Sequence, residues 1–275
     1  MSRAGASTAR HDVHHDVLAG LIVGCGVLGL LVGSFLNVVI YRVPRGESIV
    51  TPPSACPSCA TPILARDNVP VLSWLWLRGR CRHCAAPISL QYPVVEFTTG
   101  ALFAGAAARL GAAWDLPAFL ALAAGLVALA WIDAQRLILP RAVVYPTLLG
   151  VAALLVLAAA MSHEWHHLLV GALCAAAWGL LFFLLNLASP RVLGFGDVRL
   201  APVLGLALGW LGVGDVLLGF FAANLIGAVL GIVLIATKAI RRDQPIPYGV
   251  FLAAGTLLAL FAGPELLAPF RALHV

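Results

Sequence analysis

The chain alternates between long apolar stretches and short polar segments, with one long polar segment near its N-terminus. A helix needs about 20 mostly apolar residues to cross the hydrocarbon core of a bilayer. Lipid offers the backbone no hydrogen-bond partners, so each such stretch must be helical. The pattern therefore predicts an all-α polytopic membrane protein. The eight predicted spans are residues 17–41, 93–112, 116–133, 143–160, 167–188, 198–213, 215–237 and 248–270.

These spans divide the chain into parts of different character. Residues 1–16 form a polar, His-rich N-terminal tail, and no small-residue cleavage site follows a short apolar core, so we expect no signal peptide. Residues 17–41 form the first transmembrane helix. Residues 42–92 form the one long loop, rich in Pro, Cys and Arg, and residues 93–275 form a transmembrane domain.

Composition supports a membrane protein, and the charge pattern indicates its orientation in the bilayer. Only 11% of residues are charged, against about 25% in a soluble domain. With the N-terminus outside, the cytoplasmic segments hold most of the 17 Lys and Arg residues, as the positive-inside rule requires. The 42–92 loop is then cytoplasmic and the C-terminus outside. The net charge of +5 reflects these basic loops, so we expect a lipid bilayer and no nucleic acid as partner.

Two Cys-x-x-Cys pairs lie in the 42–92 loop. Each pair places two thiols on one tight turn, which is half of a tetrahedral zinc site, and the spacing between the pairs is close to that of zinc ribbons. A loop with few large apolar residues needs a disulfide or a metal ion to fold. Disulfides are rare in the cytoplasm, where this loop is expected to lie. We therefore expect a structural zinc ion, with disulfides or a thiol redox pair as alternatives. The expected ligands are Cys56, Cys59, Cys81 and Cys84.

Two aspartates are predicted at the cytoplasmic boundary. Asp133 ends the third predicted span and Asp197 opens the sixth. Two carboxylates a few Å apart share a proton, so that one can activate water while the other polarises a carbonyl group. The pattern therefore predicts an aspartyl protease pair. Gly194 and Gly196 flank Asp197 and would let a substrate strand approach closely, although an aspartate near a helix N-terminus would give the same local pattern.

Other titratable residues and other functions fit the sequence less well than this aspartate pair. Asp215 fits the start of a helix on the outside, whereas Glu96 lies near the start of the second span, beside the loop, and is a candidate supporting residue. A proton-coupled transporter would place carboxylates near mid-membrane and show internal repeats, and none is evident here. A zinc-loop scaffold without catalysis would leave the two aspartates without a role.

At these residues the sequence resembles the type IV prepilin peptidases, with motifs in order along nearly the whole chain. The two Cys-x-x-Cys pairs and the Asp133 segment belong to the match. The remaining blocks are Gly33–Pro44, Ser73–Cys84, Ile88–Glu96, Gly194–Leu200 and Pro245–Phe251. The sequence departs from the family pattern at Arg141, at Arg199 and in Pro-Tyr-Gly-Val at 247–250.

The resemblance implies proteolysis of the Gly-x-Gly-Asp type, with Asp133 and Asp197 as the catalytic pair and the four cysteines as zinc ligands. The substrate would be a prepilin or pseudopilin whose short basic leader is cut at the cytoplasmic face of the bacterial inner membrane. Many members also methylate the new N-terminus with S-adenosylmethionine and serve pilus or type II secretion assembly machinery. An intramembrane protease that cuts other membrane helices is the alternative within the same chemistry.

Overall fold

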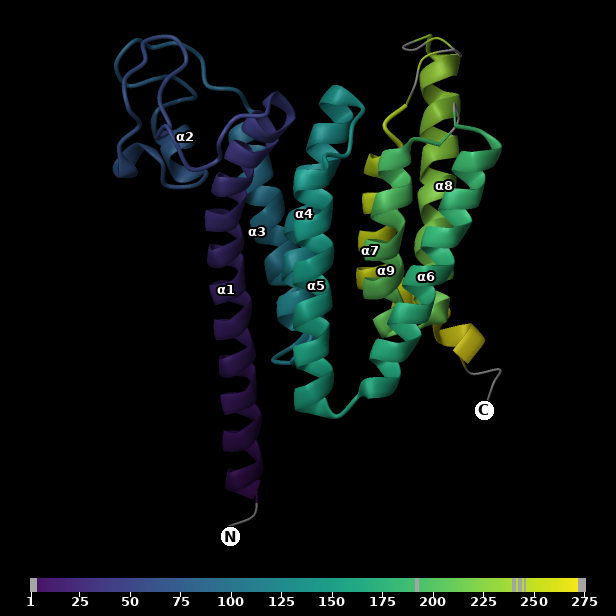
Figure 1. Ribbon diagram of the computed structural model, residues 1–275. Coiled ribbons are helices and arrows are strands. Elements are labelled where there is room, and N and C mark those ends of the chain that lie inside the picture. Colours follow the sequence, from purple (N-terminus) through teal and green to yellow (C-terminus); the bar gives the residue numbers. More distant parts are fainter. Residues whose placement is uncertain (1–3, 191–192, 239–240, 242–243, 245, 272–275) are drawn as a thin grey trace. The chain divides into compact units, whose positions relative to one another are not determined.

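The computed structural model describes residues 4–190, 193–238, 241, 244 and 246–271 (Figure 1). Pro245, the first residue of the last motif block, therefore lies outside the described residues, as do the side chains of residues 4–15, 270 and 271. The chain divides into two compact units, Met1–Leu116 and Pro117–Val275.

Two long helices form the frame of the first unit. α1 runs from Ala4 to Arg42 and α3 from Gln91 to Leu110, and they pack along each other (Figure 1). Glycines allow this contact, because a Cβ atom at Gly29 would lie 2.7 Å from the Thr99 carbonyl oxygen. Small residues let helix backbones approach closely where no hydrophobic effect drives association.

The segment between α1 and α3 contains three short helices. They are η1 (Val43–Arg45), η2 (Ala65–Asp67) and α2 (Leu72–Trp76). The guanidinium group of Arg42 donates hydrogen bonds to the carbonyl oxygens of Ser48 and Pro52, at 2.9 and 2.7 Å. These bonds tie the first turns of the loop to the end of α1.

Six helices run through the described part of the second unit. In it α6 packs on α7 and α8 on α9, and α7 also contacts α5, α8 and α9. Gly205 and Gly209 of α7 meet Cys174 and Gly171 of α6, again through small residues. The helices are α4 (Leu116–Arg136), α5 (Arg141–Ser162), α6 (Trp165–Ala188), α7 (Phe195–Leu211), α8 (Val213–Ala236) and α9 (Tyr248–Arg271).

The prediction of an all-α fold is confirmed: the described residues contain no strand, and every predicted span coincides with a long helix. Some ends differ. α1 begins at Ala4, so the tail is helical from there; α4 continues to Arg136, so Asp133 does not end it; α7 begins at Phe195, so Asp197 lies inside its first turn.

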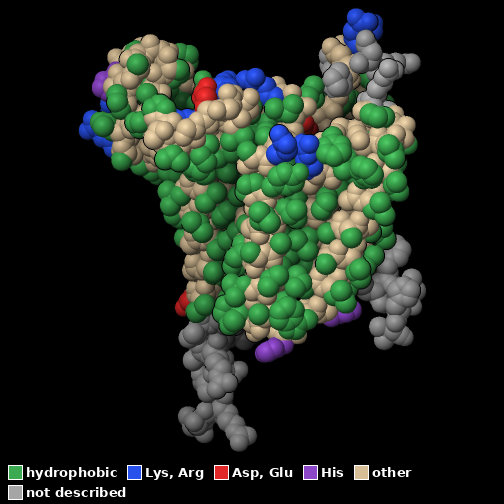
Figure 2. All heavy atoms as spheres, in the orientation of Figure 1, with side chains coloured by type: hydrophobic (Ala, Val, Ile, Leu, Met, Phe, Trp, Pro, Cys, Tyr) green, Lys and Arg blue, Asp and Glu red, His purple; other side chains and the backbone are tan. Residues whose placement is uncertain are grey.

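Six of the described helices are long and apolar enough to cross a membrane: α1, α4, α5, α6, α8 and α9. Hydrophobic side chains cover the sides of the helices (Figure 2), as lipid-facing surfaces require. α3 and α7 are not among the six, and the count of eight spans stays a prediction.

Candidate functional site

Asp197 is the third residue of α7 and folds back on the start of its own helix. Its N–H group donates to the Gly194 carbonyl oxygen at 3.1 Å. Its carboxylate in turn lies against the N–H group of Gly194, the N-cap residue. The arrangement is that of a capping box, in which the N3 side chain satisfies the N-cap amide. Only 7% of Asp197 is exposed.

Asp133 lies one turn before the end of α4 and faces the start of another helix. Its carboxylate lies near the N–H groups of Gly249 and Val250, in the first turn of α9. The free N–H groups and positive end of a helix favour a negative charge there. Asp133 is 5% exposed, and its Oδ2 atom is buried without a hydrogen-bond partner among the described residues.

The second unit brings these two aspartates together. Their carboxylates are close enough for the two charges to interact. Leu139, in the connection between α4 and α5, packs beside Gly196 and Gly249. A Cβ atom at Gly196 would lie 3.0 Å from the Leu139 Cβ, and one at Gly249 would lie 3.0 Å from the Leu139 Cδ2 and 2.9 Å from the Asp133 Oδ2. Glycine at both positions therefore leaves room for Leu139, and Gly249 also leaves room for the Asp133 carboxylate.

Tyr248 lies near Asp197 in space, and Arg199 lies near it in the chain. Tyr248, the first residue of α9, lies within electrostatic range of Asp197. Its hydroxyl group is 3.3 Å from the Asn224 Oδ1, and its ring stacks on Phe182. Arg199, two residues after Asp197, lies 4.6 Å above the Phe195 ring. Neither Tyr248 nor Leu139 was predicted as a site residue, although Tyr248 belongs to the Pro-Tyr-Gly-Val segment of the last motif block.

The Gly-x-Gly-Asp pattern occurs twice in the chain. Residues 193–200 and 211–218 share six of eight residues, Leu-Gly-x-Gly-Asp-Val-x-Leu, and each copy starts a helix. Asp215, in the second copy, is 2% exposed and packs against Gly263. The 17 residues of α7 separate the two helix starts, by about 25 Å at 1.5 Å per residue. The sequence analysis assigned Asp215 correctly to a helix start but overlooked the repeat.

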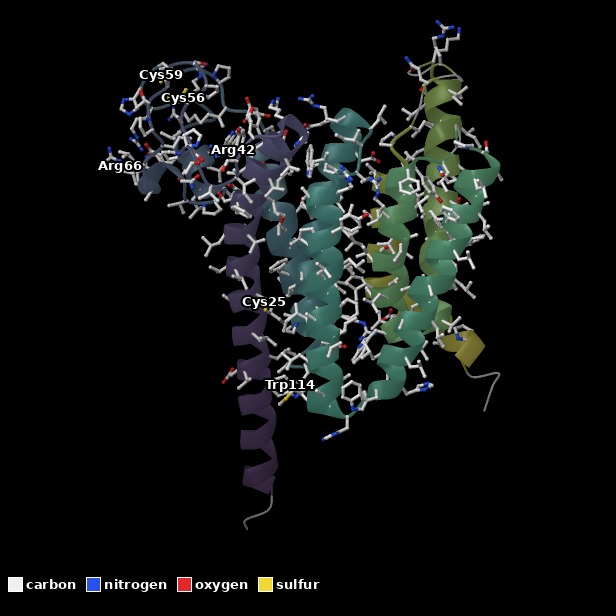
Figure 3. The ribbon with its side chains drawn as sticks, viewed as in Figure 1. Cys25, Arg42, Cys56, Cys59, Arg66 and Trp114 are labelled. Carbon is white, nitrogen blue, oxygen red and sulfur yellow. The ribbon has the colours of Figure 1, made fainter. Side chains whose placement is uncertain are left out.

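The four loop cysteines form a cluster in the first unit. Their Sγ atoms all lie within 4.8 Å of one another, and the Cys56 and Cys84 Sγ atoms are 3.8 Å apart. Four ligands at about 2.3 Å from a tetrahedral zinc ion would be about 3.8 Å apart. All four thiols are free. The cluster is thus compatible with a metal site. Figure 3 labels two of them, Cys56 and Cys59, in the loop, and Cys25 apart from them within α1.

Both cysteine pairs are held by the same backbone turn. Residues 56–63 and 81–88 share Cys-x-x-Cys-Ala-x-Pro-Ile, a second repeat that the sequence analysis missed. In each copy the first cysteine exchanges backbone hydrogen bonds across the turn, over distances of 2.8 to 3.0 Å. The alanine after the second cysteine, Ala60 or Ala85, has a φ of 57°. The two halves of the cluster are therefore built alike.

Neighbouring groups favour the thiolate form of Cys59 and Cys81, whereas burial and the other thiols raise the pKa of Cys84 to about 11. Hydrogen bonding by Thr61 lowers the pKa of Cys59 to about 6. The N–H groups of Cys84 and His83 lower the pKa of Cys81. Thiolate is the form that binds a metal ion. Beside the cluster, the Arg82 guanidinium holds the pKa of Asp67 below its usual value, over a hydrogen bond of 2.6 Å.

Glu96 joins the loop to the two helices of the first unit. Its Oε2 atom accepts a hydrogen bond of 2.7 Å from the N–H group of Val71, and its carboxylate also meets the Ser34 hydroxyl of α1. Only 7% of the residue is exposed. The structure therefore gives Glu96 a place in the first unit, where it holds the loop, whereas both aspartates lie in the second unit.

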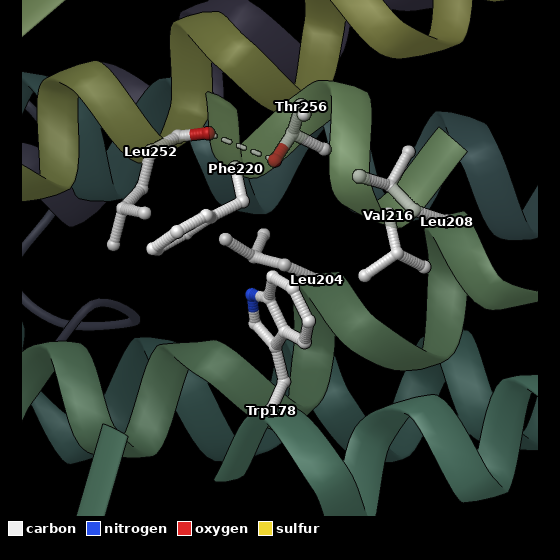
Figure 4. A pocket seen from close by; sticks show the side chains of 8 residues that line it. Trp178, Leu204, Leu208, Val216, Phe220, Leu252 and Thr256 are labelled. Carbon is white, nitrogen blue, oxygen red and sulfur yellow. Dashed lines mark hydrogen bonds between the residues drawn. The ribbon is translucent and has the colours of Figure 1, made fainter. Parts of the chain in front are cut away.

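A small apolar cavity lies among α6, α7, α8 and α9 (Figure 4). Trp178, Leu204 and Phe220 are among its lining residues, and the Thr256 hydroxyl donates to the Leu252 carbonyl oxygen at 2.8 Å. It contains no charged residue, and nothing in its lining resembles a reactive site.

Two family models match the chain. The Bacterial Peptidase A24 N-terminal domain matches residues 27–110, and the Type IV leader peptidase family matches residues 120–232. The first match covers the cysteine cluster and Glu96, and the second covers both aspartates. No solved structure matches the chain.

Proteins named prepilin leader peptidase/N-methyltransferase are similar over most of the chain. The protein of Aeromonas hydrophila is 36% identical over 266 residues, which cover 87% of this chain and 90% of the relative. That of Burkholderia pseudomallei is 36% identical over 264 residues, covering 86% and 84%. That of Myxococcus xanthus is 42% identical over 215 residues, covering 76% and 62%.

Proposed function

The chain belongs to the type IV leader peptidase family, and we propose that it is a membrane aspartyl endopeptidase that removes the short basic leader from prepilins or pseudopilins. The observation that carries the proposal is the pairing of Asp133 and Asp197, two buried carboxylates within electrostatic range of each other. We assign them as the catalytic pair. The match of both family models along the chain favours leader removal over a proton-coupled transporter.

The proposed chemistry needs one proton shared between the two carboxylates. Two carboxylates whose charges interact ionise together only at a cost, so we expect one of them to stay protonated. The ionised carboxylate takes a proton from water, which attacks the scissile carbonyl carbon, while the protonated one donates to the carbonyl oxygen. The proton then passes to the leaving amine. The Oδ2 atom of Asp133 has no partner among the described residues and is free to take part.

The starts of α7 and α9 hold the two carboxylates in place. The first turn of α9 offers N–H groups to Asp133, and the Gly194 amide lies against Asp197. Such donors hold a carboxylate in one orientation and stabilise its charged form. Gly196 and Gly249 have no side chains, so Leu139 and the Asp133 carboxylate can pack closely beside them.

The membrane placement follows from the spans and the charge pattern. Six candidate spans make the chain an integral membrane protein. We further propose eight spans in the bacterial inner membrane, with the N-terminus outside and the cysteine loop and active site cytoplasmic. A prepilin is itself a membrane helix with a basic leader, so its scissile bond would reach this boundary as it lies in the bilayer.

We assign the cysteine cluster to a structural zinc ion. The four Sγ atoms of Cys56, Cys59, Cys81 and Cys84 have the spacing and the chemistry that zinc requires. A closed set of four cysteines leaves no open coordination position, so the ion would stabilise the loop and take no direct part in the reaction.

A second activity, N-methylation of the new N-terminus, is favoured by the names of the relatives. S-adenosylmethionine would be the methyl donor. We also propose that the processed subunits pass to pilus or type II secretion assembly machinery. One assay can separate peptidase and methyltransferase activity. Leader removal shortens the substrate, and methylation transfers a labelled methyl group to it.

The test is incubation of the purified protein with a prepilin and labelled S-adenosylmethionine. We expect leader removal by the wild-type protein and none by Asp133→Asn, with the variant still inserted in the membrane. An Asp133→Asn variant that processes prepilin fully would overturn the catalytic assignment. Label incorporated after cleavage would support methylation, and cleavage without label would reject it.

A further inference from the structure

α2 exposes an apolar surface in the middle of the cysteine loop. Leu72, Leu75 and Trp76 are 62%, 58% and 84% exposed. The other residues of this short helix face the loop: Ser73 is buried, and the Trp74 ring packs on Gly79 while its N–H group donates to the Ile88 carbonyl oxygen at 3.1 Å. α2 therefore has one side packed into the loop and an apolar side without a partner in the first unit.

A hydrogen bond fixes where this surface lies along the helix pair. Val71, the N-cap of α2, donates to Glu96, and Glu96 also meets Ser34 of α1. Ser34 is eight residues before Arg42, the last residue of α1, and so about 12 Å from the end of the helix. α2 thus begins beside α1 and α3, and not beyond their ends.

That level falls within the part of α1 that crosses the membrane. The candidate span Asp16–Arg45 has 30 residues, or about 45 Å, which matches a bilayer together with its headgroups. Nearby helix residues are apolar and exposed, among them Phe35 of α1 and Phe97 of α3. Ser34 is 11 residues before Arg45, or about 17 Å inside the end of this span. The start of α2 is therefore below the headgroups, at the level of the acyl chains.

The residues that follow α2 carry the complementary charge. Arg78 and Arg80 are exposed and lie directly after the apolar residues. A Trp and Leu surface next to arginines is typical of segments that lie in the membrane interface, where the apolar side chains enter the acyl boundary and the basic ones meet anionic headgroups. Each arginine also gains from the negative potential of a leaflet rich in acidic lipids.

We propose that α2 is an interfacial membrane anchor. Leu72, Leu75 and Trp76 enter the acyl chains just below the headgroups of an anionic phospholipid bilayer, and Arg78 and Arg80 reach back to bind the lipid phosphates. The anchor divides the loop between the two Cys-x-x-Cys turns, so both halves of the metal cluster are held close to the bilayer surface. This inference does not depend on the catalytic assignment of the aspartates.

The test uses the full chain labelled with fluorotryptophan in nanodiscs of phosphatidylethanolamine and phosphatidylglycerol. The fluorine signal of Trp76 is assigned by Trp76→Phe, and by Trp76→Tyr as a second variant. We expect a spin-labelled lipid with its radical near the headgroup to broaden the Trp76 signal until it is lost, while a water-soluble paramagnetic chelate leaves it unchanged. Trp74, on the packed side of α2, is the internal control and should lose less signal to the lipid probe.

Each other outcome would overturn the proposal. Loss of the Trp76 signal with the water-soluble chelate would mean that α2 faces solvent. Protection from both probes would mean that another part of the chain covers it. Broadening by lipid that disappears when a prepilin is added would mean that the substrate, and not the bilayer, is the occupant in the working enzyme.

Discussion

Asp197 and Asp215 occupy the same position at the start of two consecutive helices. In both cases the N–H group donates over 3.1 Å to the carbonyl oxygen of a glycine three residues earlier. A Cβ atom on that glycine, Gly194 or Gly212, would lie 3.3 Å from the aspartate Oδ2. The contact between aspartate and glycine is therefore shared, although the φ of the glycine is −68° at Gly194 and 149° at Gly212. What further distinguishes Asp197 is the second carboxylate, Asp133, within range of its charge.

This pair of sites supplies a matched experiment. Asp197→Asn should abolish leader removal, because the substituted amide cannot share a proton with Asp133. Asp215→Asn changes the same atoms at the other helix start and should leave cleavage within about twofold, at a cost of up to about 1 kcal/mol in stability from the weakened cap. Prepilin cleavage and thermal unfolding in detergent would measure both effects. Equal loss of cleavage in the two variants would reduce Asp197 to a capping residue.

Gly249→Ala should slow cleavage without preventing insertion. The added methyl group would stand 2.9 Å from the Asp133 Oδ2 and 3.0 Å from the Leu139 Cδ2, so the carboxylate must move. A misplacement of a catalytic group by about 1 Å can cost about 100-fold in rate, so we expect a clear loss of turnover. The measurement is the turnover of a prepilin at saturating concentration.

Gly150→Ala is the control for that substitution. A Cβ atom at Gly150, within α5, would meet nothing within 4 Å, so activity should match the wild-type protein. If Gly249→Ala also cleaves at the wild-type rate, the close contact with Asp133 has no bearing on catalysis.

Substitution within the cysteine cluster should remove the metal. We expect purified wild-type protein to carry about one zinc ion per chain and Cys81→Ser to carry almost none, because three thiolates bind zinc far more weakly than four. Cys174→Ser, in α6 and outside the cluster, should keep the full content. Elemental analysis of the three proteins would decide, and a metal-free wild-type protein with two disulfides would contradict both the zinc assignment and the cytoplasmic placement of the loop.

Glu96→Ala should loosen the loop while the zinc content stays unchanged. The N–H group of Val71 would lose its acceptor, at a cost of about 1–3 kcal/mol if no water replaces it. Hydrogen exchange at Val71 should then be faster. Glu96→Gln keeps an acceptor oxygen at the same place and should exchange more slowly than the alanine variant. Identical exchange in the wild-type protein and Glu96→Ala would show that this bond does not hold the loop.

The sequence predicted the helices well because their apolar stretches are long and their breaks are marked. It misplaced helix ends near the candidate site. Asp133 was expected to end its helix, yet α4 continues to Arg136, because a polar residue in the last turn costs a helix little. Asp197 was expected just before its helix, whereas the capping geometry places it inside the first turn.

Contacts between distant residues are what the sequence could not provide. The hydrogen bond from Val71 to Glu96 spans 25 positions, and nothing in either segment announces it. Leu139 looked like one apolar residue in a short connection, yet it packs beside Gly196 and Gly249. The two internal repeats, in contrast, can be recognised from the sequence alone by comparing the chain with itself.

The bond between Val71 and Glu96 also changes how the cysteine loop can fold. It splits the long connection between α1 and α3 into two shorter closed segments, with one Cys-x-x-Cys turn in each. Closing two short loops and then joining them through a metal ion orders the chain in steps, and each step removes less conformational entropy than ordering the whole loop at once. The cluster therefore joins two halves of the loop that close separately, and a carboxylate that never touches the metal helps to order the chain around it.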